Sequence, residues 1–185
     1  MKRGAIFLDR DGVLTVRPGL TWKKSQIKIA HGAKLLRHFN KRRMPIVVVT
    51  NQSVVARGLV SEKGVRELHR FTQQKLERLG VSVDKFYFCP HHPEATLQRY
   101  RRRCACRKPG TALFRKAARD LGIDLRKSFM VGDMTPDILA GKRLNMKTVL
   151  LRAGHGGRDG KYNVKADFRA RDLAGALKII QKHVG

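Results

Sequence analysis

The sequence predicts a doubly wound α/β sandwich, in which helices cover both faces of a parallel sheet. Short apolar segments rich in β-branched residues alternate along the chain with longer segments of helical periodicity. Strands that alternate with helices pair in parallel, and right-handed crossovers place the helices on both faces of the sheet. In sheets of this kind, ligands bind outside the carboxyl ends of the strands.

Five segments have the composition of buried strands. They are residues 4–8, 45–50, 85–88, 128–131 and 147–151. Their almost continuous apolar character is typical of strands that are covered on both faces. A further short edge strand is expected near Ala166–Phe168.

Helical patterns separate these strands. They occupy residues 32–42, 61–79, 111–121, 136–144 and 172–183. Ser61 is the expected N-cap of the second helix. Residues 152–165 are rich in glycine and charge, which predicts a surface loop. Residues 89–110 form a second irregular stretch, and a loop of that length in a compact domain needs something to hold it together.

The length of 185 residues predicts a single domain, residues 1–185, with a core that needs no disulfides. No apolar stretch approaches the roughly 20 residues that cross a bilayer. The N-terminal residues show no cleavage site of a signal peptide. We therefore expect a soluble cytoplasmic protein that acts as a monomer.

The chain is strongly basic, with 41 Lys and Arg against 14 Asp and Glu and a formal charge of +27. Such a field concentrates small anions and binds nucleic acid non-specifically at low salt. The basic residues are spread along the chain and aromatic residues make up only 6%, which is poor for base stacking. We favour a solvated basic surface. A nucleic-acid-binding protein or a polynucleotide end phosphatase is the alternative from another class.

Two carboxylates, Asp9 and Asp11, follow the first predicted strand, and Gly12 lets the backbone curl around a ligand there. One carboxylate can attack phosphorus while the other transfers protons, and a divalent cation neutralises both phosphate and nucleophile. An ordinary acidic turn is the alternative for this pattern taken alone.

Other strand ends carry matching groups. Thr50 and Asn51 end the second strand with donors suited to phosphate oxygens. Lys108 offers a positive charge for a transferring phosphoryl group. Asp133 ends the fourth strand and is an acid able to hold magnesium, although a helix cap has the same appearance. Asp137, four residues further on, contacts a group next to the site or faces solvent.

The irregular stretch contains four soft metal ligands in two close pairs, Cys89-x-His91 and Cys104-x-Cys106. This set fits a closed tetrahedral zinc site, although His92 is adjacent and can replace the first histidine. Four protein ligands leave no open position for water, so the zinc is expected to be structural. It would brace the loop of about residues 89–108, which presents Arg107 and Lys108.

Asp9, Thr50, Lys108 and Asp133, each close to a predicted strand end, resemble the four motifs of the haloacid dehalogenase superfamily of phosphotransferases. Longer strings resemble one branch, the D-glycero-D-manno-heptose-1,7-bisphosphate 7-phosphatases and the related histidinol phosphatases. These strings are residues 7–12, 48–53, 56–58, 89–93, 104–109 and 130–133. The resemblance runs from about residue 5 to residue 151.

The resemblance implies a Rossmann-like haloacid dehalogenase fold and a magnesium-dependent phosphomonoesterase that forms an aspartyl-phosphate. Asp9 is the implied nucleophile and Asp11 the implied acid and base. The implied magnesium ligands are the Asp9 carboxylate, the Asp11 backbone carbonyl and Asp133. The implied substrate is a small phosphorylated metabolite, most directly a heptose 1,7-bisphosphate, with histidinol phosphate or another small phosphomonoester as the neighbouring alternative.

The resemblance also implies that Thr50, Asn51 and Lys108 contact the phosphoryl group, and that Arg57 and Arg107 hold the substrate. It assigns the zinc ligand to His91 rather than His92. No large cap domain fits into the connections, so the zinc loop and residues 13–27 are expected to shape an open pocket. Two positions depart from the branch: Val54 replaces a usual glycine, and Met134 replaces a lysine usual in the heptose enzymes.

Overall fold

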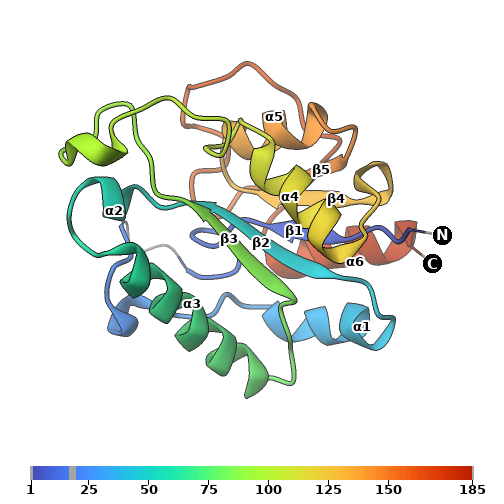
Figure 1. Ribbon diagram of the computed structural model, residues 1–185. Helices are drawn as coiled ribbons and strands as arrows, with labels where there is room; N and C mark the ends of the chain where they lie inside the picture. Colours follow the sequence, from blue (N-terminus) through green and yellow to red (C-terminus); the bar gives the residue numbers. More distant parts are fainter. Residues whose placement is uncertain (1, 17–19, 185) are drawn as a thin grey trace.

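The computed structural model describes residues 2–16 and 20–184. Its centre is one parallel sheet with the strand order β3-β2-β1-β4-β5-β6 (Figure 1). The strands are β1 (Ile6–Leu8), β2 (Ile46–Asn51), β3 (Lys85–Cys89), β4 (Phe129–Gly132), β5 (Lys147–Leu151) and β6 (Phe168–Ala170). The five predicted strands and the parallel sheet are confirmed. The edge strand begins at Phe168, two residues after its expected start.

Six α-helices alternate with these strands in the described chain. They are α1 (Leu36–Lys41), α2 (Ser53–Ala56), α3 (Glu62–Glu77), α4 (Ala112–Leu121), α5 (Thr135–Lys142) and α6 (Leu173–His183). Ser61 is the N-cap of α3, and its side chain accepts a hydrogen bond from the Gly64 backbone N–H at 3.1 Å. The first predicted helix is divided, because a 3₁₀ turn at Ala33–Leu35 precedes α1.

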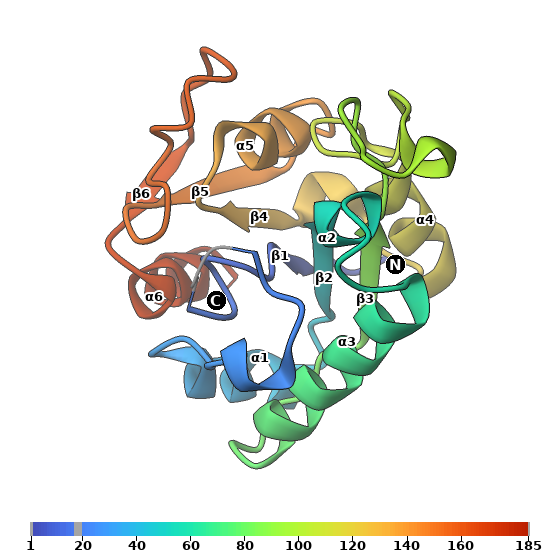
Figure 2. The same cartoon turned by 90° about the vertical axis from the view of Figure 1, so that its left-hand side faces the viewer.

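The alternating side chains of the strands build two cores, one on each face of the sheet. Ile6 and Leu8 point to the face covered by α1, α3 and α6, whereas Phe7 points to the face covered by α4 and α5. Both sets are fully buried. Figure 2 shows the sheet between these two layers of helices. The arrangement is the predicted doubly wound sandwich.

The strand order reverses at β1, which has β2 on one side and β4 on the other. Such a switch point opens a crevice at the carboxyl ends of the strands. In the described parts of the connections at this edge, the helical segments are short, namely α2 and the 3₁₀ turns Lys24–Gln26 and Gln98–Tyr100. Val54 lies inside α2 and is buried, and its backbone is helical, so the position needs no positive φ angle. Among the described residues, every helix is too short or too polar to pass through a lipid bilayer.

Candidate active site and metal cluster

A cavity of about 690 Å³ lies at the carboxyl edge of the sheet. The predicted site residues that line it are Asp9, Asp11, Thr50, Asn51, Arg57, Arg107 and Lys108. Leu20 and Thr21 also line it, as expected for the segment 13–27, whose residues 17–19 lie outside the described residues. His92 and Met134 also line the cavity. Side chains as far apart in the sequence as Asp9 and Met134 therefore share one pocket.

Three buried carboxylates, those of Asp9, Asp133 and Asp137, meet at the floor of this region. Their nearest oxygens all lie within 4.8 Å of one another. Gly12 has φ +89°, and a Cβ there would lie 2.5 Å from the Asp133 carboxylate, so only glycine fits beside it. A set of carboxylate oxygens is the donor set that magnesium prefers, and the residues present fit that ion.

The Lys108 ammonium joins two of these carboxylates. Its Nζ lies 3.0 Å from Asp9 Oδ1 and 2.7 Å from Asp137 Oδ1, and it donates to the Val49 carbonyl at 2.7 Å. Burial opposes the charge, but the two carboxylates outweigh it and raise the pKa of Lys108. Burial also raises the pKa of Asp137 to about 6, against the lowering effect of Lys108. Lys108 therefore stays charged inside the protein.

The Asp11 carboxylate accepts hydrogen bonds from Arg10, Gln52 and Thr15. Arg10, which is fully buried, forms an ion pair with Asp11 at 2.7 Å, and the Gln52 amide donates to the same carboxylate at 2.9 Å. Burial alone would raise the pKa of Asp11, but the charge of Arg10 and these hydrogen bonds hold it below its ordinary value. Asp11 is therefore a fixed carboxylate at the pocket wall.

Thr50 and Asn51 both lie at the end of β2, but they are engaged differently. The Thr50 hydroxyl accepts from the Gln52 amide at 2.9 Å. The Asn51 side chain accepts from the Lys108 backbone N–H at 2.9 Å and donates to the Lys108 carbonyl at 3.2 Å. Asn51 thus fixes the backbone that carries Lys108. Its contact with a phosphoryl group stays a prediction.

Two arginines lie at the pocket from different elements. Arg57 follows α2 and is exposed. Arg107 is half-buried and donates to the His91 carbonyl at 3.0 Å, and burial lowers its pKa. Because Arg107 is tied to the metal cluster, the position of this guanidinium depends on the loop that contains the cluster.

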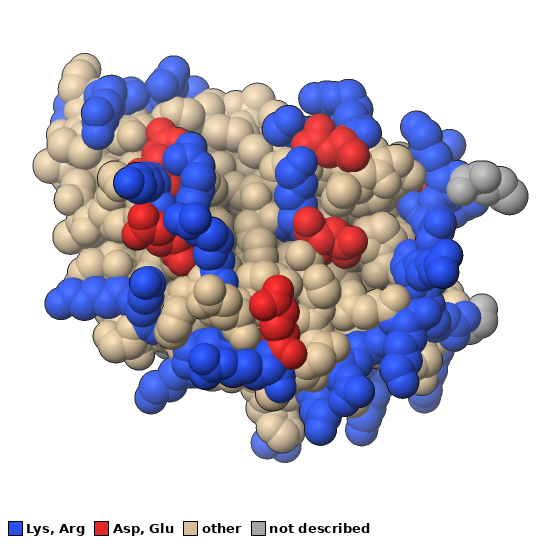
Figure 3. All heavy atoms as spheres, turned by 60° about the horizontal axis from the view of Figure 1, so that its bottom comes forward, with Lys and Arg blue, Asp and Glu red and all other residues tan. Residues whose placement is uncertain are grey.

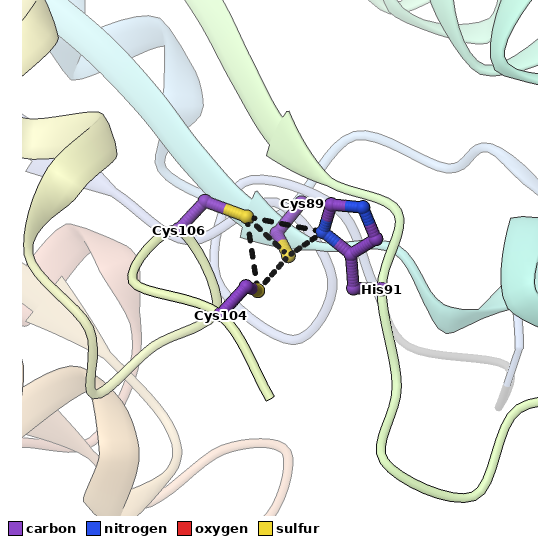
Figure 4. A group of neighbouring side chains, drawn as sticks. All are labelled: Cys89, His91, Cys104 and Cys106. Carbon is purple, nitrogen blue, oxygen red and sulfur yellow. Dashed lines mark hydrogen bonds between the residues drawn. The ribbon is translucent and has the colours of Figure 1, made fainter. Parts of the chain in front are cut away.

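Cys89, His91, Cys104 and Cys106 meet in one cluster, with Cys89 at the end of β3 (Figure 4). All four ligand atoms lie within 4.8 Å of one another. In a tetrahedral site with Zn–S bonds of about 2.3 Å, the sulfur atoms lie about 3.8 Å apart. The three sulfur atoms here lie 2.9, 3.1 and 3.5 Å apart, so a small outward shift lets this donor set accept zinc. The hydrogen bond between Cys106 and Cys89 lowers the pKa of Cys106 to about 5, which favours the thiolate that binds metals. His92 lines the pocket instead, so the cluster contains His91.

Sequence reasoning gave too little weight to three residues of this site. Asp137 is buried and forms an ion pair with Lys108. Its position four residues after Asp133 was the sequence signal that could have indicated this role. Arg10 is the buried cation that pairs with Asp11. Its role is hard to predict because the sequence places it between Asp9 and Asp11, where the two acids define the motif. Gln52 bridges Arg10, Asp11 and Thr50, a set of contacts that no local pattern reveals.

Comparison with known proteins identifies the class to which this fold and site belong. A family model described as HAD-hydrolase-like matches residues 105–176. A crystal structure of the D,D-heptose 1,7-bisphosphate phosphatase from B. bronchiseptica, complexed with magnesium and phosphate, superposes with a TM-score of 0.84 at 27% identity. The match covers 97% of this chain and 99% of that one. The protein is thus a HAD-like hydrolase with phosphatase activity.

Two curated relatives narrow the class. The D-glycero-beta-D-manno-heptose-1,7-bisphosphate 7-phosphatase of Photorhabdus laumondii is 37% identical over 187 residues, which cover 96% of this chain and 97% of the relative. The enzyme of the same name from Haemophilus ducreyi is 40% identical over 157 residues, covering 83% and 86%. The chain belongs to the family of D-glycero-beta-D-manno-heptose-1,7-bisphosphate 7-phosphatases.

Proposed function

We propose that the protein is a magnesium-dependent phosphatase that removes the 7-phosphate from a D-glycero-D-manno-heptose 1,7-bisphosphate. The observation that carries the proposal is the convergence of Asp9, Asp133, Asp137 and Lys108. Asp9, Asp137 and Lys108 line the pocket, and Asp133 lies beside them. Three carboxylates and one ammonium leave an excess of negative charge that one divalent cation balances, and Arg57 and Arg107 of the same pocket then offset a phosphate dianion. The names of the relatives supply the substrate.

In the proposed reaction, a carboxylate oxygen of Asp9 attacks phosphorus, and the bond from phosphorus to the substrate oxygen breaks. Asp11 takes up a proton from solvent before this step and gives it to the departing alkoxide. Asp11 then takes a proton from a water molecule that attacks the aspartyl-phosphate, which releases phosphate and restores Asp9. The lowered pKa of Asp11 favours the base half of this role.

Other residues position the phosphoryl group and the metal. Asp9, Asp133 and the Asp11 carbonyl would hold magnesium, which when bound neutralises phosphate oxygens during the transfer. Lys108 supplies a fixed positive charge that needs no reorganisation, because its neighbours already hold it in place. Thr50 would donate to a phosphate oxygen from the end of β2.

Arg57 and Arg107 would hold the substrate at the mouth of the pocket, where both side chains lie. Asn51, the third predicted substrate-binding residue, lines the same pocket. We assign it the further task of fixing Lys108, because both of its amide groups contact the Lys108 backbone.

We also infer that the Cys89–Cys106 cluster holds one structural zinc ion. Its four side chains form a closed donor set, and the cluster joins the end of β3 to the segment that carries Arg107 and Lys108. The ion would brace this segment against the pocket and take no part in the reaction.

The wider context is also a proposal. We treat residues 1–185 as one domain acting as a monomer in the cytoplasm, and the shared sheet between both large cores supports the single domain. Over the centre of the face in Figure 3, Asp and Glu lie among Lys and Arg, whereas the right-hand edge carries Lys and Arg alone. The low aromatic content of 6% supports a solvated basic surface better than a dedicated nucleic-acid face.

Rates on a set of substrates test the proposed function. With magnesium present, phosphate release is measured from heptose 1,7-bisphosphate, histidinol phosphate and a 5′-phosphorylated oligonucleotide. We expect kcat/KM for the bisphosphate to exceed the others by about tenfold or more. A higher value for histidinol phosphate or the oligonucleotide would replace the substrate assignment.

A further inference from the structure

The loop between β5 and β6 reaches the pocket from the side opposite the metal cluster. Lys161 and Tyr162 of this loop line the same cavity as Asp9 and Lys108. Figure 2 shows the two segments on either side of the carboxyl edge, with the β5–β6 loop at upper left and the cluster segment at upper right. The pocket therefore has a second wall that the reaction at Asp9 does not use.

The same cavity joins this loop to the other wall. Lys161 and Tyr162 line it together with Arg57, His92 and Arg107. The two walls therefore border one space.

The loop is tied to the catalytic region at several points. The Asp159 carboxylate accepts from the Thr135 backbone N–H at 2.8 Å and from its hydroxyl at 2.7 Å, at the start of α5. The His155 N–H donates to the Asp133 carboxylate at 2.8 Å, and the Gly157 N–H donates to the Asp133 carbonyl at 2.8 Å. These hydrogen bonds attach the loop to Asp133 and to Thr135.

At one position, the loop passes so close to Asp133 that only glycine fits. Gly154 has φ +67°, and a Cβ there would collide with the Asp133 carboxylate. Asp159 has its pKa lowered, because the hydrogen bonds from Thr135 outweigh the opposing effect of burial. The carboxylate of Asp159 is therefore charged at neutral pH and holds the loop two residues before Lys161.

The cations at the mouth of the pocket exceed what one phosphoryl group needs. Arg57, Arg103, Arg107 and Lys161 line the pocket. Within residues 2–16 and 20–184, none of the four makes an ion pair with a carboxylate. Arg107 is bound to a backbone carbonyl. Lys161 is exposed and Tyr162 is 40% exposed, so both can turn toward a ligand.

We propose that residues 158–162 form an arm that holds the end of the substrate away from the reacting phosphoryl group, with Lys161 binding a second anionic group and Tyr162 packing on the carbon skeleton. Asp159 is the positioning residue of this arm. The inference rests on the proposed function, because a sugar bisphosphate brings a second phosphate to this end of the pocket. Discrimination between bisphosphate and monophosphate would then depend on the β5–β6 loop.

The test compares KM for heptose 1,7-bisphosphate with KM for heptose 7-phosphate in the magnesium-loaded enzyme. In Lys161→Gln, the ratio of the bisphosphate KM to the monophosphate KM should rise about tenfold, because one charge-assisted contact is lost. Lys165→Gln removes an exposed lysine of the same loop outside the pocket lining, and it should keep the wild-type ratio.

A double variant separates positioning from general loss of structure. Asp159→Ala should raise the same ratio. The double variant Asp159→Ala/Lys161→Gln should raise it no further than Lys161→Gln alone, because both substitutions remove the same contact between Lys161 and the substrate. An unchanged ratio in Lys161→Gln, or an equal rise in Lys165→Gln, overturns the arm while the proposed function stands. If the wild type releases no phosphate from the bisphosphate, the proposed function fails and the arm fails with it.

Discussion

Lys108 shows how one residue can serve both the fold and the reaction. Its side chain is 2% exposed, and its ammonium lies between the carboxylates of Asp9 and Asp137. Burying one such charge costs several kcal/mol, and only well-placed partners offset that cost. The same partners orient the ammonium toward Asp9, where charge develops on the phosphoryl group. Asp137 thus acts on the reaction through Lys108.

His69 carries a prediction about pH and stability. It is buried on α3 and stacked on Phe86, with ring centroids 4.9 Å apart. Burial and the nearby charge of Arg10 lower its pKa to about 3, from an ordinary value of 6.5. The folded protein therefore keeps His69 neutral, whereas the unfolded chain takes up a proton below about pH 6.5. The stability that this neutral histidine provides above pH 6.5 is lost as the pH falls toward 3.

Between pH 7 and pH 5, this linkage lowers the free energy of unfolding by about 2 kcal/mol. We expect the loss to be smaller by that amount in His69→Leu, measured by urea denaturation at both pH values. His31→Gln, at an exposed position, should keep the wild-type pH dependence. Equal losses in wild type and His69→Leu would show that His69 does not titrate in this way.

The metal-cluster segment is the element on which the mouth of the pocket depends. It leaves the sheet at Cys89, and Arg107 and Lys108 lie at its far end. Between these points it forms only a three-residue 3₁₀ turn, Gln98–Tyr100. A segment with so little regular structure needs the cluster to fix it.

Removal of zinc tests this dependence. We expect one zinc per chain in the wild type, much less in Cys104→Ser, and the wild-type content in His92→Gln, measured by elemental analysis. After chelation and return of magnesium, amides of residues 90–107 should exchange hydrogen faster, while those of β2 stay protected. Phosphate release should fall because Arg107 and Lys108 lose their support. A wild type without zinc, or unchanged exchange after chelation, would contradict the assignment.

The elements differ in how far the sequence could predict them. The strands were predictable because runs of β-branched residues, such as residues 46–50, are typical of buried strands. The helix α2 was not, because four residues are too few to show a period. The contacts of Asn51 with Lys108 and of Lys161 with the pocket depend on loops that meet across the fold. No local sequence pattern predicts contacts between such loops. The motifs at strand ends were easier to place together, because parallel pairing aligns the ends of the strands.

At the scale of the whole molecule, the sheet collects residues from positions 9 to 137 at one carboxyl edge. Parallel pairing aligns the ends of β1, β2 and β4, so Asp9, Thr50 and Asp133 arrive together. The formal charge of +27 surrounds this edge with a field that attracts phosphorylated metabolites. The basic residues in Figure 3 are spread widely, which suits attraction of small anions from many directions.

The central claim is that Asp9 forms a covalent bond to phosphorus, and its replacement tests that claim most directly. Phosphate release from heptose 1,7-bisphosphate is measured with magnesium for wild type, Asp9→Asn and Glu77→Gln, an exposed control at the end of α3. We predict that Asp9→Asn retains the wild-type circular dichroism and loses about a thousandfold or more in rate, whereas Glu77→Gln keeps the wild-type rate. A folded Asp9→Asn variant that releases phosphate at a rate close to that of the wild type would contradict the mechanism.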